Sequence, residues 1–421
     1  MRYYLIAFFI TVIFILPWFA LNYPAELNSI TGLIADKWNQ LASVIVVHNP
    51  KTVAGLQSTY NIAVPKGLAK VRILIVPGHE PDYGGAEYGS LKERNMTVEL
   101  AQDLSTFLSN DPHYQIFTTR DQNSWNPVFA DYFKNHWDDI TAWEDAYKNE
   151  TSNMIRLGQI ETTTPAVFHA DAPADVAMRL YGIDKWSNEN NIDIMIHIHF
   201  NDYPRADNST PGKYTGFAIY IPQKDYYNSS TTDALAQTVF KRLAKYNPVS
   251  NLPGENSGIV PDQDLIAVGS FNSVNAASML IEYGYIYEPQ FTNPNIRSLA
   301  LKDLAYQTYL GLQDFFDPTT NLNLAKTYDT LILPHTWSTP ITEKYSSSTE
   351  VYALQTALVA DGIYPPQPSS FNDCPRTGKL GPCTVSALGV FQKNWNILGE
   401  KGKVGPKTID ALNQEFGVKT I

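Results

Sequence analysis

Basic side chains, cysteine and nucleotide-binding glycine motifs are all scarce or missing in this chain of 421 residues. Its 31 Lys and Arg residues against 42 Asp and Glu residues give a formal net charge of −11. Because nucleic-acid phosphates are bound by a basic surface, this balance argues against a nucleic-acid partner. The sequence contains no Walker or Rossmann glycine pattern. Its length predicts two or three domains with a sizeable core.

An uncharged apolar run extends from Tyr3 to Leu21. Nineteen residues can cross a bilayer core as a helix, and a secretory signal is the competing interpretation. A cleavable signal needs small residues before the cut, but bulky Trp18 and Tyr23 occupy that position for the two available cuts. We therefore expect residues 1–24 to be an uncleaved membrane anchor rather than a signal, and residues 25–70 to be a stalk or preface. Either interpretation exports everything downstream.

The two cysteines, Cys374 and Cys383, are nine positions apart. In an exported chain such a pair predicts a disulfide that closes a short loop. Two thiolates without further cysteine or nearby histidine make a poor metal site, so we do not expect metal there.

A histidine and a carboxylate stand at adjoining ends of a predicted strand and a predicted helix. The β-branched run Val71–Val76 predicts a buried strand that breaks at Pro77-Gly78, which leaves His79 on the loop at its end. Glu93 then opens a segment with apolar residues at helical spacing, namely Met96, Leu100, Leu104 and Leu108. Imidazole and carboxylate are zinc ligands, although a lone histidine after Pro-Gly is more often a turn residue.

Two later strands carry further candidate residues. Ile192–Phe200 reads IDIMIHIHF, and a strand sends His197 and His199 to the same face. Ser278–Tyr285 reads SMLIEYGY and places Glu282 directly after three apolar residues. A buried carboxylate is costly unless it is paired, hydrogen-bonded or bound to a metal. Glu282 is therefore the candidate general base, while the residues alone leave the choice between the two histidines open.

These stretches together resemble the zinc-dependent N-acetylmuramoyl-L-alanine amidases of the type 3 amidase family. The resemblance rests on PGHE, a glutamate that opens a helix, IHIHFN and LIEYG in this order, with Thr118-Thr119-Arg120-Asp121 as the family's TRD element. It implies that His79, Glu93 and His199 bind Zn²⁺ and that Glu282 is the catalytic carboxylate. His199 is preferred over His197 because Phe200-Asn201 keeps the family spacing. The sequence assigns no substrate-binding residue.

The chain departs from the family pattern at three places. Glu80 stands where the family usually has glycine, and we expect it to be a solvated loop carboxylate. His197 replaces a small polar residue, and we expect it to support the site by hydrogen bonding. An insertion at about residues 121–191 is rich in aromatic and acidic residues and contains His136 and His169. We expect a surface subdomain that packs its own aromatics, although some family members carry an inhibitory helix in this part.

The resemblance implies an α/β domain over residues 71–316 with a mixed, largely parallel sheet flanked by helices. The alternation of strand and helix patterns is compatible with this fold. Further predicted elements are a strand at Tyr214–Pro222 and helices at Thr231–Lys245 and Ile296–Phe316.

A second unit follows a stretch of linker composition at residues 317–348, which is rich in Pro, Thr and Ser. Residues 349–421 contain Leu-Gln, Asp-Gly, Gly-Pro-x-Thr, Phe-Gln and a second Gly-Pro-x-Thr in helical contexts. This order resembles the small three-helix peptidoglycan-binding domain, which holds an enzyme on the cell wall and does no chemistry.

The resemblance implies a bacterial cell-envelope hydrolase that cleaves the amide between N-acetylmuramic acid and L-alanine in peptidoglycan. Zinc would activate the attacking water, and Glu282 would accept its proton. Two alternatives remain: a zinc peptidase acting within the stem peptide, and a silent wall-binding scaffold or activator. Peptidoglycan and, through the N-terminal segment, the membrane are the expected partners, with a protein activator as a further possibility.

Overall fold

The computed structural model describes residues 46–66, 69–317, 328–344 and 346–418. Their centre is a six-stranded sheet with the strand order β4-β1-β5-β8-β6-β7. The strands are β1 (Val71–Pro77), β4 (Tyr114–Thr118), β5 (Ile194–Asn201), β6 (Ala218–Pro222), β7 (Ile259–Asp262) and β8 (Ala277–Tyr285). Neighbouring strands are parallel except β6 with β8, so the predicted mixed, largely parallel sheet is confirmed.

The central strands β1, β5 and β8 are covered on both faces. Every residue of β8 is buried, as are most residues of β1 and β5, which accounts for their nearly unbroken apolar sequence. The register places His199 of β5 beside Glu282 of β8, and His197 beside Val76 of β1. Because side chains alternate between faces, His197, His199 and Glu282 share one face of the sheet.

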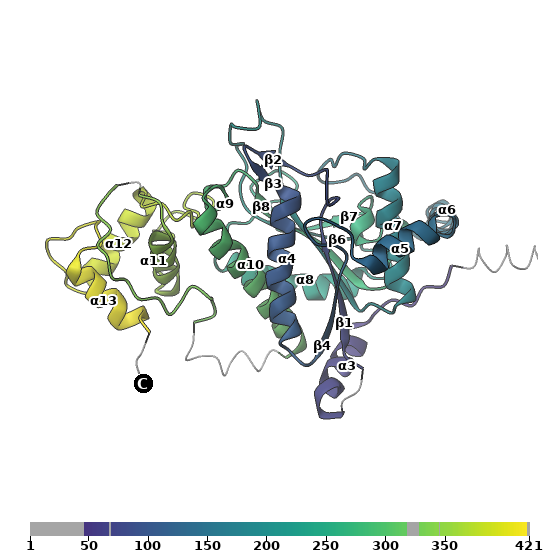
Figure 1. Cartoon of the computed structure of the whole chain (residues 1–421), viewed down its shortest axis with the longest axis horizontal. Coiled ribbons are helices and arrows are strands. Elements are labelled where there is room, and N and C mark those ends of the chain that lie inside the picture. Colours follow the sequence, from purple (N-terminus) through teal and green to yellow (C-terminus); the bar gives the residue numbers. More distant parts are fainter. Residues whose placement is uncertain (1–45, 67–68, 318–327, 345, 419–421) are drawn as a thin grey trace, which may run out of the picture.

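One face of the sheet is covered by an apolar helical layer, with α4 and α10 on one side of the strands in Figure 1. Its helices are α3 (Val53–Lys66), α4 (Glu93–Ser109), α8 (Ser229–Ala244) and α10 (Pro294–Phe316), and the short α9 (Pro289–Thr292) precedes α10. The apolar positions predicted for α4 are all buried, which confirms its periodicity: Met96, Leu100, Leu104 and Leu108.

The opposite face is covered by the insertion, whose helices are α5 (Pro127–Asn135), α6 (Trp137–Arg156) and α7 (Ala174–Glu189). Its aromatic side chains contact one another, as Phe129 does with Trp186 at 4.6 Å between ring centroids. They also share a buried cluster with Leu74 and Met195 of the sheet. The insertion is therefore the second helical layer of the fold, and not a surface subdomain that packs only its own aromatics.

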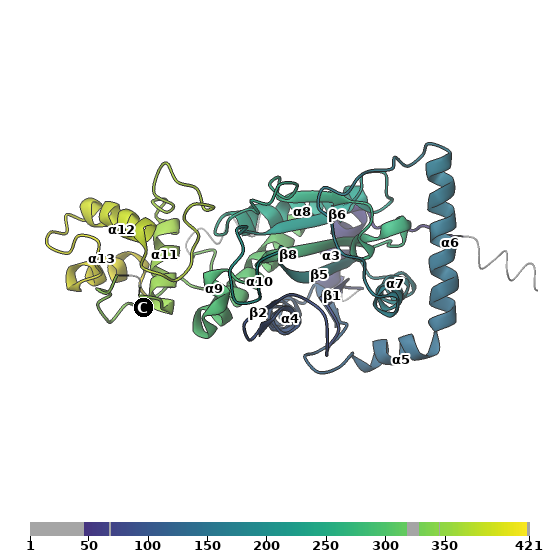
Figure 2. The ribbon, with the colours of Figure 1, turned by 90° about the horizontal axis from the view of Figure 1, so that it is seen from above.

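Three helices form the C-terminal part, as predicted: α11 (Thr349–Ala360), α12 (Pro382–Asn394) and α13 (Pro406–Phe416). They lie beyond α9 and α10, at the opposite end of the molecule from α6 (Figure 2). The predicted disulfide joins Cys374 to Cys383, with 5.8 Å between their Cα atoms.

Part of the predicted linker is packed against these helices. Trp337 is buried, and its backbone N–H and carbonyl bond the Asn413 side chain of α13 at 2.8 and 2.7 Å. Residues 318–327 of that linker lie outside the described residues, and so does the predicted anchor at residues 3–21. Within the part that is described, no helix has the length and apolar character needed to span a bilayer.

Candidate metal centre

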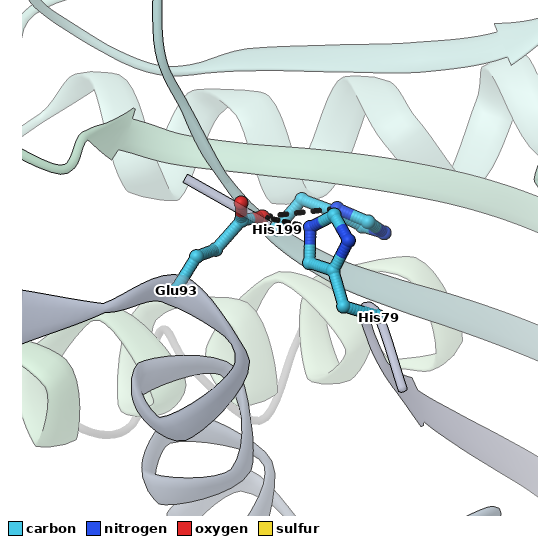
Figure 3. A group of neighbouring side chains, drawn as sticks. All are labelled: His79, Glu93 and His199. Atoms are coloured by element: carbon cyan, nitrogen blue, oxygen red, sulfur yellow. Dashed lines mark hydrogen bonds and ion pairs between the residues drawn. The ribbon is translucent and has the colours of Figure 1, made fainter. Parts of the chain in front are cut away.

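The three predicted ligands meet at one end of the sheet, each from a different element. His79 follows β1, His199 lies near the end of β5 and Glu93 is the first residue of α4, and Figure 3 shows their side chains converging. Oε1 of Glu93 lies 2.8 Å from Nε2 of His79 and 3.1 Å from Nδ1 of His199. The ligand atoms are all within 4.8 Å of one another, and no other such group of His, Cys, Asp and Glu occurs among the described residues.

The metal loop is residues 77–86, from the last residue of β1 onward, and two of its glycines permit close approaches to the histidine rings. A Cβ atom on Gly78 would lie 2.4 Å from Cε1 of His199, and one on Gly85 would lie 2.7 Å from Cδ2 of His79. Gly85 also has a φ of +81°, which L side chains rarely adopt. His79 itself has a φ of 68°, so the loop holds a non-glycine residue in the left-handed region.

Arg120 of the TRD element fixes the beginning of the metal loop. Its guanidinium donates to the Pro77 carbonyl at 3.2 Å, to the Gly78 carbonyl, and to the Arg94 carbonyl of α4 at 3.0 Å. Burial lowers the pKa of Arg120 to about 10, which leaves it charged at neutral pH. The element resembling TRD is thus a backbone clamp between the metal loop and α4.

Glu93 is oriented by backbone donors and by the two histidines. The N–H of Ala86 donates to its Oε2 at 2.7 Å, and the N–H of Phe200 donates to its Oε1 at 3.0 Å. Burial alone would raise the pKa of Glu93, but His79 and His199 outweigh it and hold that pKa below its usual range. Glu93 is therefore a buried, ionised carboxylate.

The donor atoms fit a zinc ion. Neutral imidazole nitrogen and carboxylate oxygen are ligands that zinc accepts. Burial lowers the pKa of His199 and outweighs Glu93, which acts to raise it. The lowered pKa favours a neutral ring with a free lone pair. The close contact between His79 and Glu93 is not aligned as a hydrogen bond, so the buried Nε2 of His79 has no hydrogen-bond partner. A buried nitrogen without a hydrogen-bond partner that faces a carboxylate fits a site able to hold a cation.

Glu282 lies beside this cluster, next to His199 in the neighbouring strand. It is 8 % exposed and its Oε2 has no hydrogen-bond partner. Burial, reinforced by the charges of Glu93 and Glu255, raises the pKa of Glu282 well above its usual range. A buried carboxyl without a partner is costly, and a perturbed acid beside a metal-binding cluster is a candidate for proton transfer.

The structure separates the two histidines of β5. His199 joins the cluster and His197 does not. His197 is 1 % exposed, and burial together with His199 lowers its pKa to about 3. We expected His197 to support the site by hydrogen bonding, but its Nε2 has no hydrogen-bond partner.

Glu80 corrects an expectation from the sequence. It is 5 % exposed and not solvated, because Nε of Arg179 donates to its Oε1 at 2.8 Å and Nε1 of Trp125 to its Oε2 at 3.2 Å. Both partners belong to the insertion. Because Arg179 and Trp125 are 99 and 45 residues from Glu80, the sequence around Glu80 could not indicate these contacts.

Glu255 is a site-adjacent residue that sequence reasoning missed. It is fully buried and accepts hydrogen bonds from Tyr220 at 2.6 Å, Asn201 at 2.7 Å and Tyr285 at 3.2 Å. It thereby ties the ends of β5 and β8 to the middle of β6, close in sequence to His199 and Glu282. Asn201 stood in the IHIHFN motif, but nothing in the sequence around Glu255 marked it.

The two histidines of the insertion stay outside the cluster. His136 is exposed and pairs with Asp139 at 3.1 Å. His169 lies against the ring of Tyr220, with 5.0 Å between the ring centroids. Neither His136 nor His169 belongs to the group of His79, Glu93 and His199.

A family model described as N-acetylmuramoyl-L-alanine amidase matches residues 73–313, which is more than half of the chain. No curated protein matches the sequence.

Several solved structures are similar to part of this chain. The CwlD amidase of Clostridioides difficile, in complex with the GerS lipoprotein, is 13 % identical with a TM-score of 0.38, covering 59 % of this chain and 100 % of that chain. An N-acetylmuramoyl-L-alanine amidase of Clostridium difficile 630 is 17 % identical with a TM-score of 0.36, covering 58 % and 97 %. Ami1 of Mycobacterium smegmatis is 14 % identical with a TM-score of 0.38, covering 58 % and 98 %.

Proposed function

The chain belongs to the N-acetylmuramoyl-L-alanine amidase family, and we propose that it is a zinc-dependent enzyme that releases stem peptides from peptidoglycan. Family membership supports a peptidoglycan amidase. The observation that carries the zinc dependence is the convergence of His79, Glu93 and His199 beside the partnerless carboxyl of Glu282.

His79, Glu93 and His199 would hold the metal. A bound zinc ion would supply Lewis acidity, which lowers the pKa of a bound water and polarises a carbonyl. The chain's own contribution is a set of metal-ligand atoms held in fixed positions. Two backbone N–H groups and Arg120 hold Glu93 and the metal loop in place before substrate arrives.

Glu282 would move the proton. Its Oε2 accepts a proton from water while the water oxygen forms a bond to the amide carbon of the lactyl group. The C–N bond then breaks, and Glu282 returns the proton to the amine of L-alanine. A carboxyl whose pKa lies above its usual range retains this proton long enough to return it, and its protected position limits loss of the proton to solvent.

The C-terminal helices would bind the cell wall, and the enzyme would act in the cell envelope. Membrane attachment through residues 3–21 and a protein activator stay predictions from the sequence. The peptidoglycan-binding role can be measured directly, because sedimentation with purified sacculi would fall when residues 349–421 are removed.

The function can be tested with the purified full chain and its Glu282→Gln variant. Peptidoglycan digests would be analysed by mass spectrometry, and bound metal would be counted by elemental analysis. Glu288→Gln is a matched control, because Glu288 is a buried carboxylate that accepts from the backbone N–H groups of Tyr285 and Gly216 at 2.8 and 2.9 Å and does not belong to the group of three ligands.

We expect the wild type to hold one zinc ion per chain and to release peptides that begin with L-alanine. Glu282→Gln should keep the metal and lose about 10²–10⁴-fold in rate, the usual contribution of a general base, while Glu288→Gln keeps its activity. Fragments cut within the stem peptide would identify a peptidase instead. Metal without any release would favour a silent scaffold, and a wild type without metal would overturn the proposal.

A further inference from the structure

We propose that the insertion is a positioning element for the metal loop, and that Arg179 of α7 holds His79 in place through Glu80. The inference rests on the proposed function, because it assigns a role toward the metal bound by His79, Glu93 and His199. It concerns residues that the four-residue site does not include.

The contact between the insertion and the metal loop is built around the Glu80 carboxylate. Arg179 and Trp125 each donate to a different oxygen, at 2.8 and 3.2 Å, and the side chain of Glu80 is 7 % exposed. Hydrogen bonds that involve an ionised group are about twice as strong as neutral ones. Because Glu80 directly follows His79 in the chain, this carboxylate fixes the backbone that carries the ligand.

A second contact from the same end of α7 reaches further along the metal loop. Asp175 accepts from Nη2 of Arg179 at 2.5 Å and from the hydroxyl of Tyr83 at 3.4 Å. Arg179 and Asp175 are four residues apart and lie on one face of the helix. The first two turns of α7 thus hold the loop at Glu80 and at Tyr83.

The loop requires such support because of its backbone. His79 has a φ of 68°, a conformation that is unfavourable for a non-glycine residue and persists only when its surroundings enforce it. Arg120 holds the carbonyls of Pro77 and Gly78 on the upstream side of His79. The insertion supplies the matching hold on the downstream side.

The insertion adds no metal-binding side chain to the cluster of His79, Glu93 and His199. The close cluster contains no residue from 121–191, although the structure describes all of the insertion. No His, Cys, Asp or Glu of the insertion is therefore placed as a fourth ligand. The insertion contacts the metal loop at Glu80, the residue next to the ligand.

Loss of Arg179 alone would leave Glu80 buried without its cation. Such an uncompensated charge is strongly unfavourable, so the loop would move to bring the carboxylate to water. That movement would carry His79 away from Glu93 and His199. We therefore expect weaker metal binding in a chain that is still folded.

The test measures metal affinity in the purified full chain, with Zn²⁺ in competition with a chelating dye and with the visible absorption of bound Co²⁺. Changes in the outer contacts of metal sites typically weaken affinity about 10–100-fold, and we expect about tenfold for Arg179→Ala together with altered Co²⁺ bands. Trp125→Phe, which keeps an aromatic ring but removes the N–H donor, should give a smaller loss, and Arg179→Lys a partial rescue.

Lys185→Ala is the matched control. Lys185 pairs with Glu189 on the same helix but does not contact the metal loop, so its loss should leave the affinity for Zn²⁺ unchanged within about twofold. Melting of each metal-free variant reports whether the fold is retained, and affinities are compared per folded chain.

A double-mutant cycle separates positioning from general destabilisation. In a Glu80→Ala background, Arg179→Ala should add no further loss of affinity, because the two residues act through one contact. Multiplicative losses, or a Zn²⁺ affinity unchanged by Arg179→Ala, would overturn the inference while the proposed function stands. A wild type that binds no metal would instead remove the proposed function itself.

Discussion

Two joints in this protein are made by an arginine, and they differ in how deeply the arginine is buried. At the metal loop, the side chains of Arg179 and Glu80 are 19 % and 7 % exposed. At the junction between the sheet domain and the C-terminal helices, the side chains of Arg376 and Asp303 are each 1 % exposed. Arg376 also donates to the Tyr246 carbonyl and to Thr356 Oγ1, both at 2.8 Å.

The difference shows what each joint can do. Arg376 links α10, the residues after α8, and α11, so water cannot replace any partner without separating the two parts. Arg179 keeps some contact with solvent, so the metal loop that carries Glu80 can move while the fold remains. The first joint is expected to govern stability and the second to govern the metal site.

The largest effect should come from Arg376→Ala. Removing one partner of a buried ion pair costs about 3–5 kcal/mol, because Asp303 is left as an unpaired buried charge. Chemical denaturation of the full chain would measure this loss in the free energy of unfolding. Lys393→Ala, at an exposed position of α12, is the control and should change it by less than about 0.5 kcal/mol.

A paired replacement sharpens this prediction. Arg376→Met combined with Asp303→Leu removes both charges and should be less destabilising than Arg376→Ala alone, because apolar residues of similar size often replace buried ion pairs at little cost. If the paired variant lost more than the single one, the unpaired charge would not be the cause.

The disulfide should come next in size, because it closes the loop that carries Arg376. Cys374 precedes Arg376 by two residues and is bonded to Cys383 beyond it. Replacing both cysteines by serine removes a constraint on the unfolded chain that is typically worth about 2–4 kcal/mol. Combined with Arg376→Ala, the loss should be smaller than the sum, since the two changes share one loop. Full additivity in denaturation experiments would show that the disulfide acts only within the C-terminal helices.

Neither joint could be predicted from the sequence, whereas much of the site could. The strand pattern at Val71–Val76 and the helical spacing after Glu93 are local signals, and both elements form as predicted. His79, Glu93 and His199 come together as the motifs implied. Arg376 and Asp303, by contrast, are 73 residues apart and belong to no periodic pattern.

The same limit explains the expectations that failed. The loop sequence predicts a solvated Glu80, because nothing near a loop carboxylate in the sequence indicates a distant arginine. The aromatic composition of the insertion indicated packing but could not say against what, and Phe129 and Trp186 lie over the sheet. The burial of Trp337 could not be predicted, because single apolar residues between Pro, Thr and Ser show no periodic pattern.

A further buried carboxyl tests whether a cationic partner is what keeps the buried acids of the two joints charged. Asp184 of α7 is fully buried and accepts from Ser273 Oγ at 2.9 Å, while its Oδ1 has no partner. The groups facing it, Tyr147 of α6 and Tyr181, bring no positive charge. Burial therefore raises the pKa of Asp184 well above its usual range.

Asp184→Asn should give the smallest effect, and one of opposite sign. A carboxyl whose pKa is raised on folding stabilises the fold fully below its unfolded pKa, about 4, and this contribution is lost as pH rises through its folded pKa. The amide does not ionise, so the variant should match the wild type near pH 4 and melt at a higher temperature at alkaline pH. Melting curves of the metal-free full chain across this range would measure the difference. If the melting temperatures of the two proteins differed by the same amount at every pH, the Asp184 carboxyl would already be charged in the folded protein. The hydrogen bond from Ser273 would then be enough to keep Asp184 ionised, as Arg179 does for Glu80.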